Sequence, residues 1–177
     1  MLKNKVNFTE IFKKYKNLGD LKMSKNCIFC QMVKGELPCH LIDENDDFMA
    51  FLTIFPNTFG ASVVIPKQHY SSYAFELSDQ VLTNLVLYTK QVALKLDRYF
   101  DDVGRTAMVF EGFGVDHVHA KLFPMHQTKN THEKWQPINS SVDKYFDAYE
   151  GYISSHDARR ADDQALAQLA ENIRSIA

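Results

Sequence analysis

The stretch DHVHAKLFPMH, from Asp116 to His126, alternates polar and apolar side chains along its first half. Successive side chains of a β-strand point to opposite faces of a sheet. We therefore expect a strand on which His117, His119 and Lys121 share one face, while the apolar residues between them pack into a core. Solvated histidines on an ordinary half-buried strand are the alternative interpretation, because such strands show the same alternation.

The residues around this stretch predict further strands and one long helix. Apolar or β-branched runs bounded by turn residues predict strands over residues 40–43, 48–54, 61–65 and 106–110. Ser78 is placed as the N-cap of a helix whose apolar stripe extends from Leu82 to Phe100. A second helix is expected near the C-terminus, with one apolar face formed by Leu166, Leu169 and Ile173. This order of elements favours an α+β fold with an antiparallel sheet.

The length of the chain bounds the number of domains. With 177 residues, 45% of them hydrophobic, one ordinary core is expected. Residues 1–23 are lysine-rich, and the apolar spacing from Phe8 to Tyr15 is that of a short helix. We expect this segment to be a mobile N-terminal extension outside the fold, and residues 24–177 to form a single domain with a C-terminal helical extension.

The net charge and the hydropathy of the sequence indicate which partners and which compartment to expect. A formal net charge of -2 gives no broad cationic surface for a nucleic-acid backbone, so no nucleic-acid partner is expected. The sequence has no run near the roughly 20 apolar residues that a membrane span needs, and its N-terminus lacks the apolar core of a secretory signal. We therefore expect a cytoplasmic protein without a membrane partner.

The chain contains three cysteines, two of them in the motif Cys27-x-x-Cys30. In a reducing compartment such a pair is typical of a metal site or of a redox site rather than a disulfide. A redox site would need the pair at a helix N-terminus in a thioredoxin-like context, which the sequence does not predict. Cys39 is expected to be a small buried side chain.

Two glycines precede the histidine stretch, in the segment from Glu111 to Gly114. Gly112 and Gly114 allow close backbone approach, and a loop of this kind can offer N–H groups to an anion. Histidine and lysine side chains beside such a loop suit a phosphate group. The sequence therefore predicts a site for a phosphorylated ligand.

Taken in order, these motifs resemble the histidine triad (HIT) superfamily of nucleotide hydrolases and transferases. The signature of that family is His-x-His-x-His with apolar residues at x, and the matching stretch here is His117-Val-His119-Ala-Lys121. The resemblance covers residues 26–127 and includes CIFC at 27–30 and AFLTIFPNTFGASVVIPKQHY at 50–70. It implies an α+β, HIT-like fold with roughly five antiparallel strands, one long central helix and a C-terminal helix, usually as a homodimer.

The resemblance also implies a reaction at the α-phosphate of a nucleotide-type substrate. His119 would be the nucleophile and form a covalent nucleotidyl-histidine, His117 and Lys121 would complete the catalytic set, and the enzyme would be a hydrolase or a nucleotidyltransferase. Lysine at the third triad position departs from the family pattern, because it offers a fixed positive charge instead of a neutral imidazole. The alternative is a catalytically weak nucleotide-binding or protein-interaction module on the same scaffold.

Further residues follow from the same resemblance. Thr53 occupies a position where relatives usually carry an aspartate that binds ribose, and Asn57 is a second candidate nucleotide-binding residue. Several family members hold a structural zinc ion, and the matching ligands here are Cys27, Cys30, His69 and His117. If zinc binds, His117 is a ligand that orients the strand carrying His119, and the alternative is a pair of ordinary buried cysteines.

Overall fold

The fold is seen in a computed structural model that describes residues 26–129, 138, 148 and 160–176. The short helix expected to end before Gly19, with Phe8 and Tyr15 on its apolar face, lies outside these residues. The expectations for the extension 1–23 therefore stay predictions.

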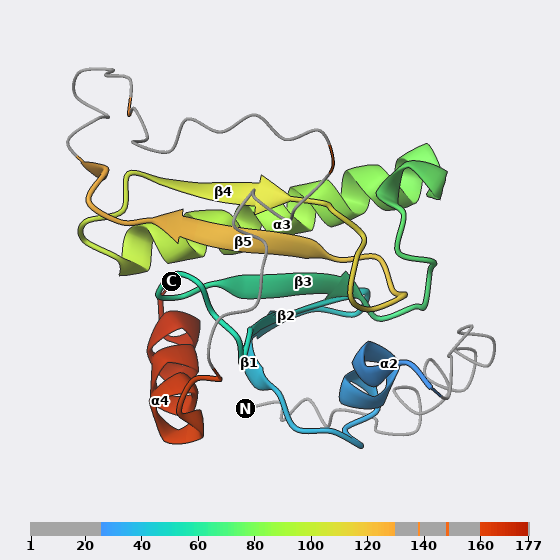
Figure 1. The fold of residues 1–177 in the computed structure, drawn as a ribbon, viewed down its shortest axis with the longest axis horizontal. Coiled ribbons are helices and arrows are strands. Elements are labelled where there is room, and N and C mark those ends of the chain that lie inside the picture. The colour runs from blue at the N-terminus through green and yellow to red at the C-terminus, as the bar shows by residue number, and fades with distance from the viewer. Residues whose placement is uncertain (1–25, 130–137, 139–147, 149–159, 177) are drawn as a thin grey trace, which may run out of the picture.

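A five-stranded antiparallel sheet forms the centre of the molecule, with the strand order β1-β2-β3-β5-β4 (Figure 1). Four of the strands contain five residues each, and β5 contains six. Their bounds are β1 His40–Glu44, β2 Phe48–Leu52, β3 Ser62–Pro66, β4 Arg105–Val109 and β5 Ala120–Met125. The predicted α+β class and the antiparallel sheet are confirmed.

Two helices cover one face of the sheet. α3 (Asp79–Tyr99) begins where the Ser78 hydroxyl accepts the Val81 N–H, as the sequence predicts. α4 (Asp163–Arg174) begins where Asp162 caps the Ala165 N–H at 2.9 Å. The apolar faces of both helices pack on the same sheet face and form the main core, which includes Leu85, Val92, Leu96, Leu166, Leu169 and Ile173.

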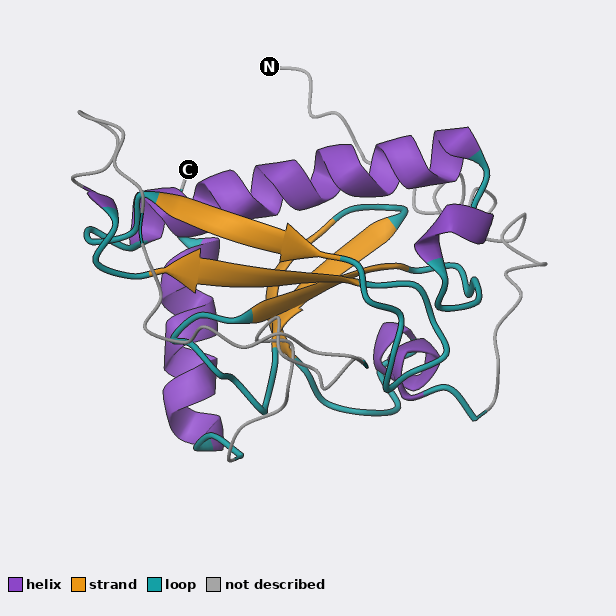
Figure 2. Cartoon of the chain, turned by 45° about the horizontal axis from the view of Figure 1, so that its top comes forward, coloured by secondary structure: helices purple, strands orange, loops and turns teal. Residues whose placement is uncertain are grey.

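The opposite face of the sheet carries a second, smaller core beneath α2 (Ile28–Val33), a helix that the sequence did not predict. Figure 2 shows α3 and the short α2 on opposite sides of the strands. Successive side chains of a strand point to opposite faces of the sheet, which explains why the apolar residues form two separate cores. Within β2, Ala50 faces the main core, while Met49 and Phe51 face α2. A 3-10 turn, η1 (Ala74–Glu76), leads into α3.

The structure corrects the expected strand at His117 and His119. Strand β5 begins at Ala120, so both histidines lie in the irregular segment that leads into it. The alternation nevertheless continues through that segment, because Val118 and Ala120 belong to the main core on the α3 face. Among the residues that the structure describes, no helix is long and apolar enough to cross a membrane.

Candidate functional site

The histidine segment is fixed by its backbone. The Val118 N–H donates to the Tyr70 carbonyl at 3.0 Å, and the His117 N–H donates to the Val115 carbonyl at 2.8 Å. The Val118 side chain is fully buried in the main core. Because neighbouring side chains point to opposite sides, His117 and His119 turn toward α2, where the Phe29 ring meets both imidazoles edge-on.

His119 is buried and held by one ring nitrogen. Its Nδ1 donates to the His117 carbonyl at 2.7 Å, so the lone pair of the neutral ring lies on Nε2. Burial lowers the pKa of His119, and the nearby Lys121 charge lowers it further. The imidazole is therefore neutral at neutral pH, with a basic nitrogen opposite the hydrogen-bonded one.

Lys121 follows on β5, two residues beyond His119. Its ammonium group forms an ion pair with the carboxylate of Glu111, from the loop after β4. The two side chains are only 18% and 8% exposed, so the pair is largely shielded from water. An unpaired carboxylate beside a phosphate site would repel the ligand, and the Lys121 ammonium is a partner of this one.

The glycine loop has a backbone conformation that favours glycine at both positions, and close approach of another segment is found at Gly112 alone of the two. Gly112 and Gly114 have φ angles of 75° and 91°, in the region that favours glycine. At Gly112 an added Cβ would lie 3.0 Å from the Ser72 carbonyl oxygen. Asp116 accepts the Ser72 N–H at 2.9 Å, so the loop is fastened to the segment after β3.

Thr53 and Asn57 lie farther along the sheet. Leu122 is level with Ser62 and Leu52 across the strands, and Thr53 follows Leu52, which places it about four residues, or roughly 13 Å, from His119 along the strand direction. The Thr53 hydroxyl accepts the Phe55 N–H at 3.2 Å, and the Asn57 side chain is exposed. The structure therefore separates Thr53 from the histidines along the strand direction, and Asn57 lies in the loop between β2 and β3.

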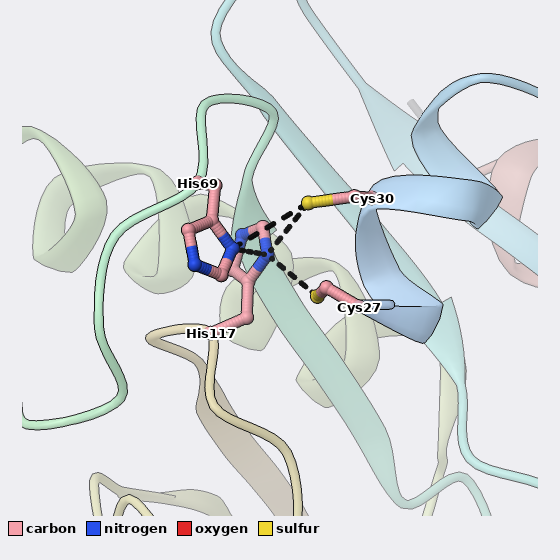
Figure 3. A group of neighbouring side chains, drawn as sticks. All are labelled: Cys27, Cys30, His69 and His117. Carbon is pink, nitrogen blue, oxygen red and sulfur yellow. Dashed lines mark hydrogen bonds between the residues drawn. The ribbon is translucent and has the colours of Figure 1, made fainter. Parts of the chain in front are cut away.

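The four predicted metal ligands converge. Cys27, Cys30, His69 and His117 place one ligand atom each within 4.8 Å of all the others (Figure 3). His117 Nδ1 lies 3.4 Å from Cys27 Sγ, 3.7 Å from Cys30 Sγ and 3.4 Å from His69 Nδ1. The motif at the start of α2, the loop after β3 and the segment before β5 thus meet at one point.

The protonation of His117 suits a metal ligand. Its Nε2–H donates to the Pro66 carbonyl at 2.9 Å, which leaves the Nδ1 lone pair pointing into the cluster. Burial lowers the pKa of His117 to about 4. Tetrahedral zinc with ordinary bond lengths would separate nitrogen from sulfur by about 3.6 Å and nitrogen from nitrogen by about 3.3 Å, close to the observed distances. The residues present fit the ion.

The cysteine pair also requires a correction. The sequence predicted no helix after Cys27, yet Cys27 is the N-cap residue of α2, so a Cys-x-x-Cys motif does stand at a helix N-terminus. The observation that favours a metal site over a redox site is the pair of imidazole nitrogens facing the thiols, with His69 Nδ1 at 3.5 Å from Cys30 Sγ.

Two other aromatic candidates lie apart from this cluster or outside the described residues. His126 donates to Asp102 at 3.0 Å and to the Phe59 carbonyl at 2.9 Å. Its ring therefore links the loop after α3 to the loop between β2 and β3. Trp135, the one tryptophan of the sequence, lies outside the described residues. The supporting contacts of Phe29, Tyr70 and Ser72 come from segments distant in sequence, and no local pattern indicated them.

Comparison with known proteins identifies the family. Residues 34–128, more than half of the sequence, match the HIT domain, and the chain belongs to the HIT family. It is 38% identical over 103 residues to the adenosine 5′-monophosphoramidase of Schizosaccharomyces pombe, covering 56% of this chain and 74% of that protein. It is 35% identical over 109 residues to a 16.1 kDa HIT-like protein of Mycoplasma pneumoniae, covering 59% of this chain and 75% of that protein.

A solved structure shows the same fold. The zinc-bound histidine triad family protein of Mycobacterium smegmatis superimposes with a TM-score of 0.60 at 17% sequence identity, covering 85% of this chain and 92% of that protein. Together with the sequence match, this similarity confirms the HIT-like fold expected from the motif order.

Proposed function

We propose that this protein is a nucleotide hydrolase or nucleotidyl transferase that acts at an α-phosphate through a covalent nucleotidyl-histidine. The observation that carries the proposal is the geometry of His119, whose Nδ1–H is held by the His117 carbonyl while Nε2 keeps its lone pair. The similarity to a monophosphoramidase supports a nucleotide-type substrate.

The proposed reaction has two steps. Nε2 of His119 attacks the α-phosphorus, a phosphorus–nitrogen bond forms, and the leaving group departs with the electron pair of its broken bond and takes up a proton from solvent. Water or another acceptor then attacks phosphorus, the phosphorus–nitrogen bond breaks, and its electron pair returns to Nε2. The proton of the attacking water passes to solvent. The Nδ1–H bond to the His117 carbonyl holds the ring in one tautomer throughout.

Lys121 stands at the proposed third triad position. Negative charge develops on the phosphate oxygens during both steps, and a nearby ammonium group stabilises that charge. Gly112 and Gly114 would bring backbone N–H groups close to the same oxygens. Thr53 and Asn57 stay proposed contacts for a more distant part of the nucleotide.

We further propose a structural zinc ion held by Cys27, Cys30, His69 and His117, on the strength of the donor set and its distances. When bound, zinc would supply a rigid link between three segments of the chain. His117 would then be a ligand whose carbonyl also orients His119. This arrangement leaves His119 and Lys121 as the groups that meet the substrate.

Intact-mass measurement tests the enzymatic proposal. The protein is mixed with adenosine 5′-phosphoramidate, a dinucleoside polyphosphate or a nucleotide sugar, and quenched before turnover is complete. We expect a transient nucleotidyl adduct in the wild type and in the control His126→Ala, and none in His119→Ala. Turnover should fall by a factor of about 1,000 or more in His119→Ala.

The same samples distinguish the alternative function. Folded wild-type protein that binds nucleotide without adduct or turnover across this panel would favour the nucleotide-binding module. Full turnover by His119→Ala would instead exclude His119 as the nucleophile. The expected homodimer also stays a proposal, and the molar mass from light scattering would test it.

A further inference from the structure

We propose that Glu111 is an internal counter-ion and a positioning residue for Lys121, and that the phosphate of the ligand displaces the Glu111 carboxylate from the Lys121 ammonium. This inference rests on the proposed nucleotide site and deepens it. It assigns a role to a carboxylate that the family signature does not include.

The register of the sheet brings the two residues together. Lys121 on β5 pairs with Val109 on the neighbouring strand β4, and Glu111 follows Val109 by two residues. The Glu111 carboxylate reaches back to the Lys121 ammonium across this edge of the sheet. Lys121 is also level with Val63 of β3, which belongs to the smaller core beneath α2. The ion pair therefore lies on the same face as His119.

Burial makes each charge dependent on the other. Glu111 has an 8% exposed side chain, and a carboxylate removed from water to that extent is costly unless a positive charge accompanies it. Both groups also act on the nucleophile: the Lys121 ammonium lowers the pKa of His119, while the Glu111 carboxylate raises it. Without a ligand, the two charges thus act on His119 in opposite directions.

Binding of a phosphate group changes the interactions of the Lys121 ammonium. The phosphate and the Glu111 carboxylate are both anions that compete for the Lys121 ammonium, and like charges near one cation repel each other. Glu111 therefore holds Lys121 in place before binding and opposes the phosphate during binding. A residue with a merely structural role would support binding and would never oppose it.

The direction in which nucleotide affinity changes when Glu111 loses its charge tests this inference. Affinity for adenosine 5′-monophosphate is measured by calorimetry for the wild type, Glu111→Gln, Lys121→Met and the double variant. Glu111→Gln keeps a hydrogen-bond acceptor but removes the competing charge, so we expect binding roughly threefold to tenfold tighter than wild type. Lys121→Met leaves the carboxylate beside the phosphate, and binding should weaken by about tenfold or more. The double variant should recover most of that loss.

The outcomes separate this inference from the proposed function. Unchanged or weaker binding by Glu111→Gln, or a double variant no better than Lys121→Met, would overturn the counter-ion role while leaving the nucleotide site intact. No binding by any of the four proteins would overturn the proposed function and this inference together. If Lys121→Met fails to fold by circular dichroism, the comparison of Glu111→Gln with wild type still decides the question.

Discussion

Two histidines separated by one residue have opposite ring nitrogens engaged. His117 donates Nε2–H to the Pro66 carbonyl and presents Nδ1 to the cysteine cluster, whereas His119 donates Nδ1–H to the His117 carbonyl and keeps the lone pair on Nε2. A backbone carbonyl thus decides which nitrogen of each ring is available for chemistry. The sequence predicted both residues, but the position of the Pro66 carbonyl depends on the packing of a different strand.

His126 allows a pH prediction at the same scale. Burial alone would lower its pKa, but hydrogen bonds to the Phe59 carbonyl and to Asp102 outweigh burial and raise the pKa above the ordinary 6.5. A histidine whose pKa is raised by folding stabilises the folded state fully below pH 6.5, and this contribution disappears as pH rises through the folded-state pKa. We expect wild type to exceed His126→Gln in unfolding free energy at pH 6, and the difference to shrink by pH 8.5.

Urea unfolding of the two proteins at both pH values measures this difference. Asp102→Asn provides the matched control, because the pKa of Asp102 is lowered mainly by its hydrogen bond with His126. The Asn variant should also lose most of the pH dependence. A wild-type advantage that stays constant between pH 6 and pH 8.5 would contradict the assignment.

Helix α2 shows how a short element depends on distant residues. It has six residues, too few for a stable helix on its own, and its Cys27 side chain makes no capping hydrogen bond. Its buried contacts are Phe29 and Cys30, which meet the imidazoles of the candidate site. Local sequence could not predict this helix, because its stability comes from the cluster.

Removal of the bound metal should therefore destabilise α2. A metal present at about 1,000 times its dissociation constant stabilises a fold by roughly 4 kcal/mol, so chelation should lower the unfolding temperature by roughly 10 °C. We expect about one zinc per chain in the wild type and in Cys39→Ser, and little in Cys30→Ser. Hydrogen exchange should accelerate in residues 28–33 of Cys30→Ser and of the chelated wild type.

Metal analysis and calorimetry of these three proteins provide the measurements. Cys39 is the matched control, since it is partly buried beside the smaller core yet is not part of the four-residue cluster. Equal metal content in Cys30→Ser and Cys39→Ser would remove the basis for the zinc site.

At the scale of the whole molecule, periodicity predicted the sheet and the two longer helices well, but not helix α2. The apolar stripe after Ser78 became α3, and the β-branched run at 61–65 became β3 within one residue at each end. The site was less predictable from residues alone. Cys27 and His117 are 90 positions apart, and the Lys121–Glu111 pair depends on how β4 and β5 are joined. Family resemblance supplied the first pairing, and only the structure supplied the second.

The two ends of the chain should contribute very differently to stability. The HIT domain match begins at residue 34, and the lysine-rich segment 1–23 was predicted to lie outside the fold. In contrast, α4 buries Leu166, Leu169 and Ile173 against β1 and β2. Each such side chain contributes roughly 1.5–3 kcal/mol, so losing all three would remove much of the roughly 5–15 kcal/mol that stabilises a typical domain.

Two truncations test this contrast. A chain that begins at Met23 should keep wild-type turnover and change its unfolding temperature by no more than about 2 °C. A chain that ends at Arg160 should lose cooperative unfolding and turnover together, because removing α4 exposes the main core between β1 and α3. Calorimetry of both truncated chains measures the unfolding temperature and the cooperativity of unfolding. Marked destabilisation of the chain beginning at Met23 would place the N-terminal segment inside the folded unit and move the domain boundary to the start of the sequence.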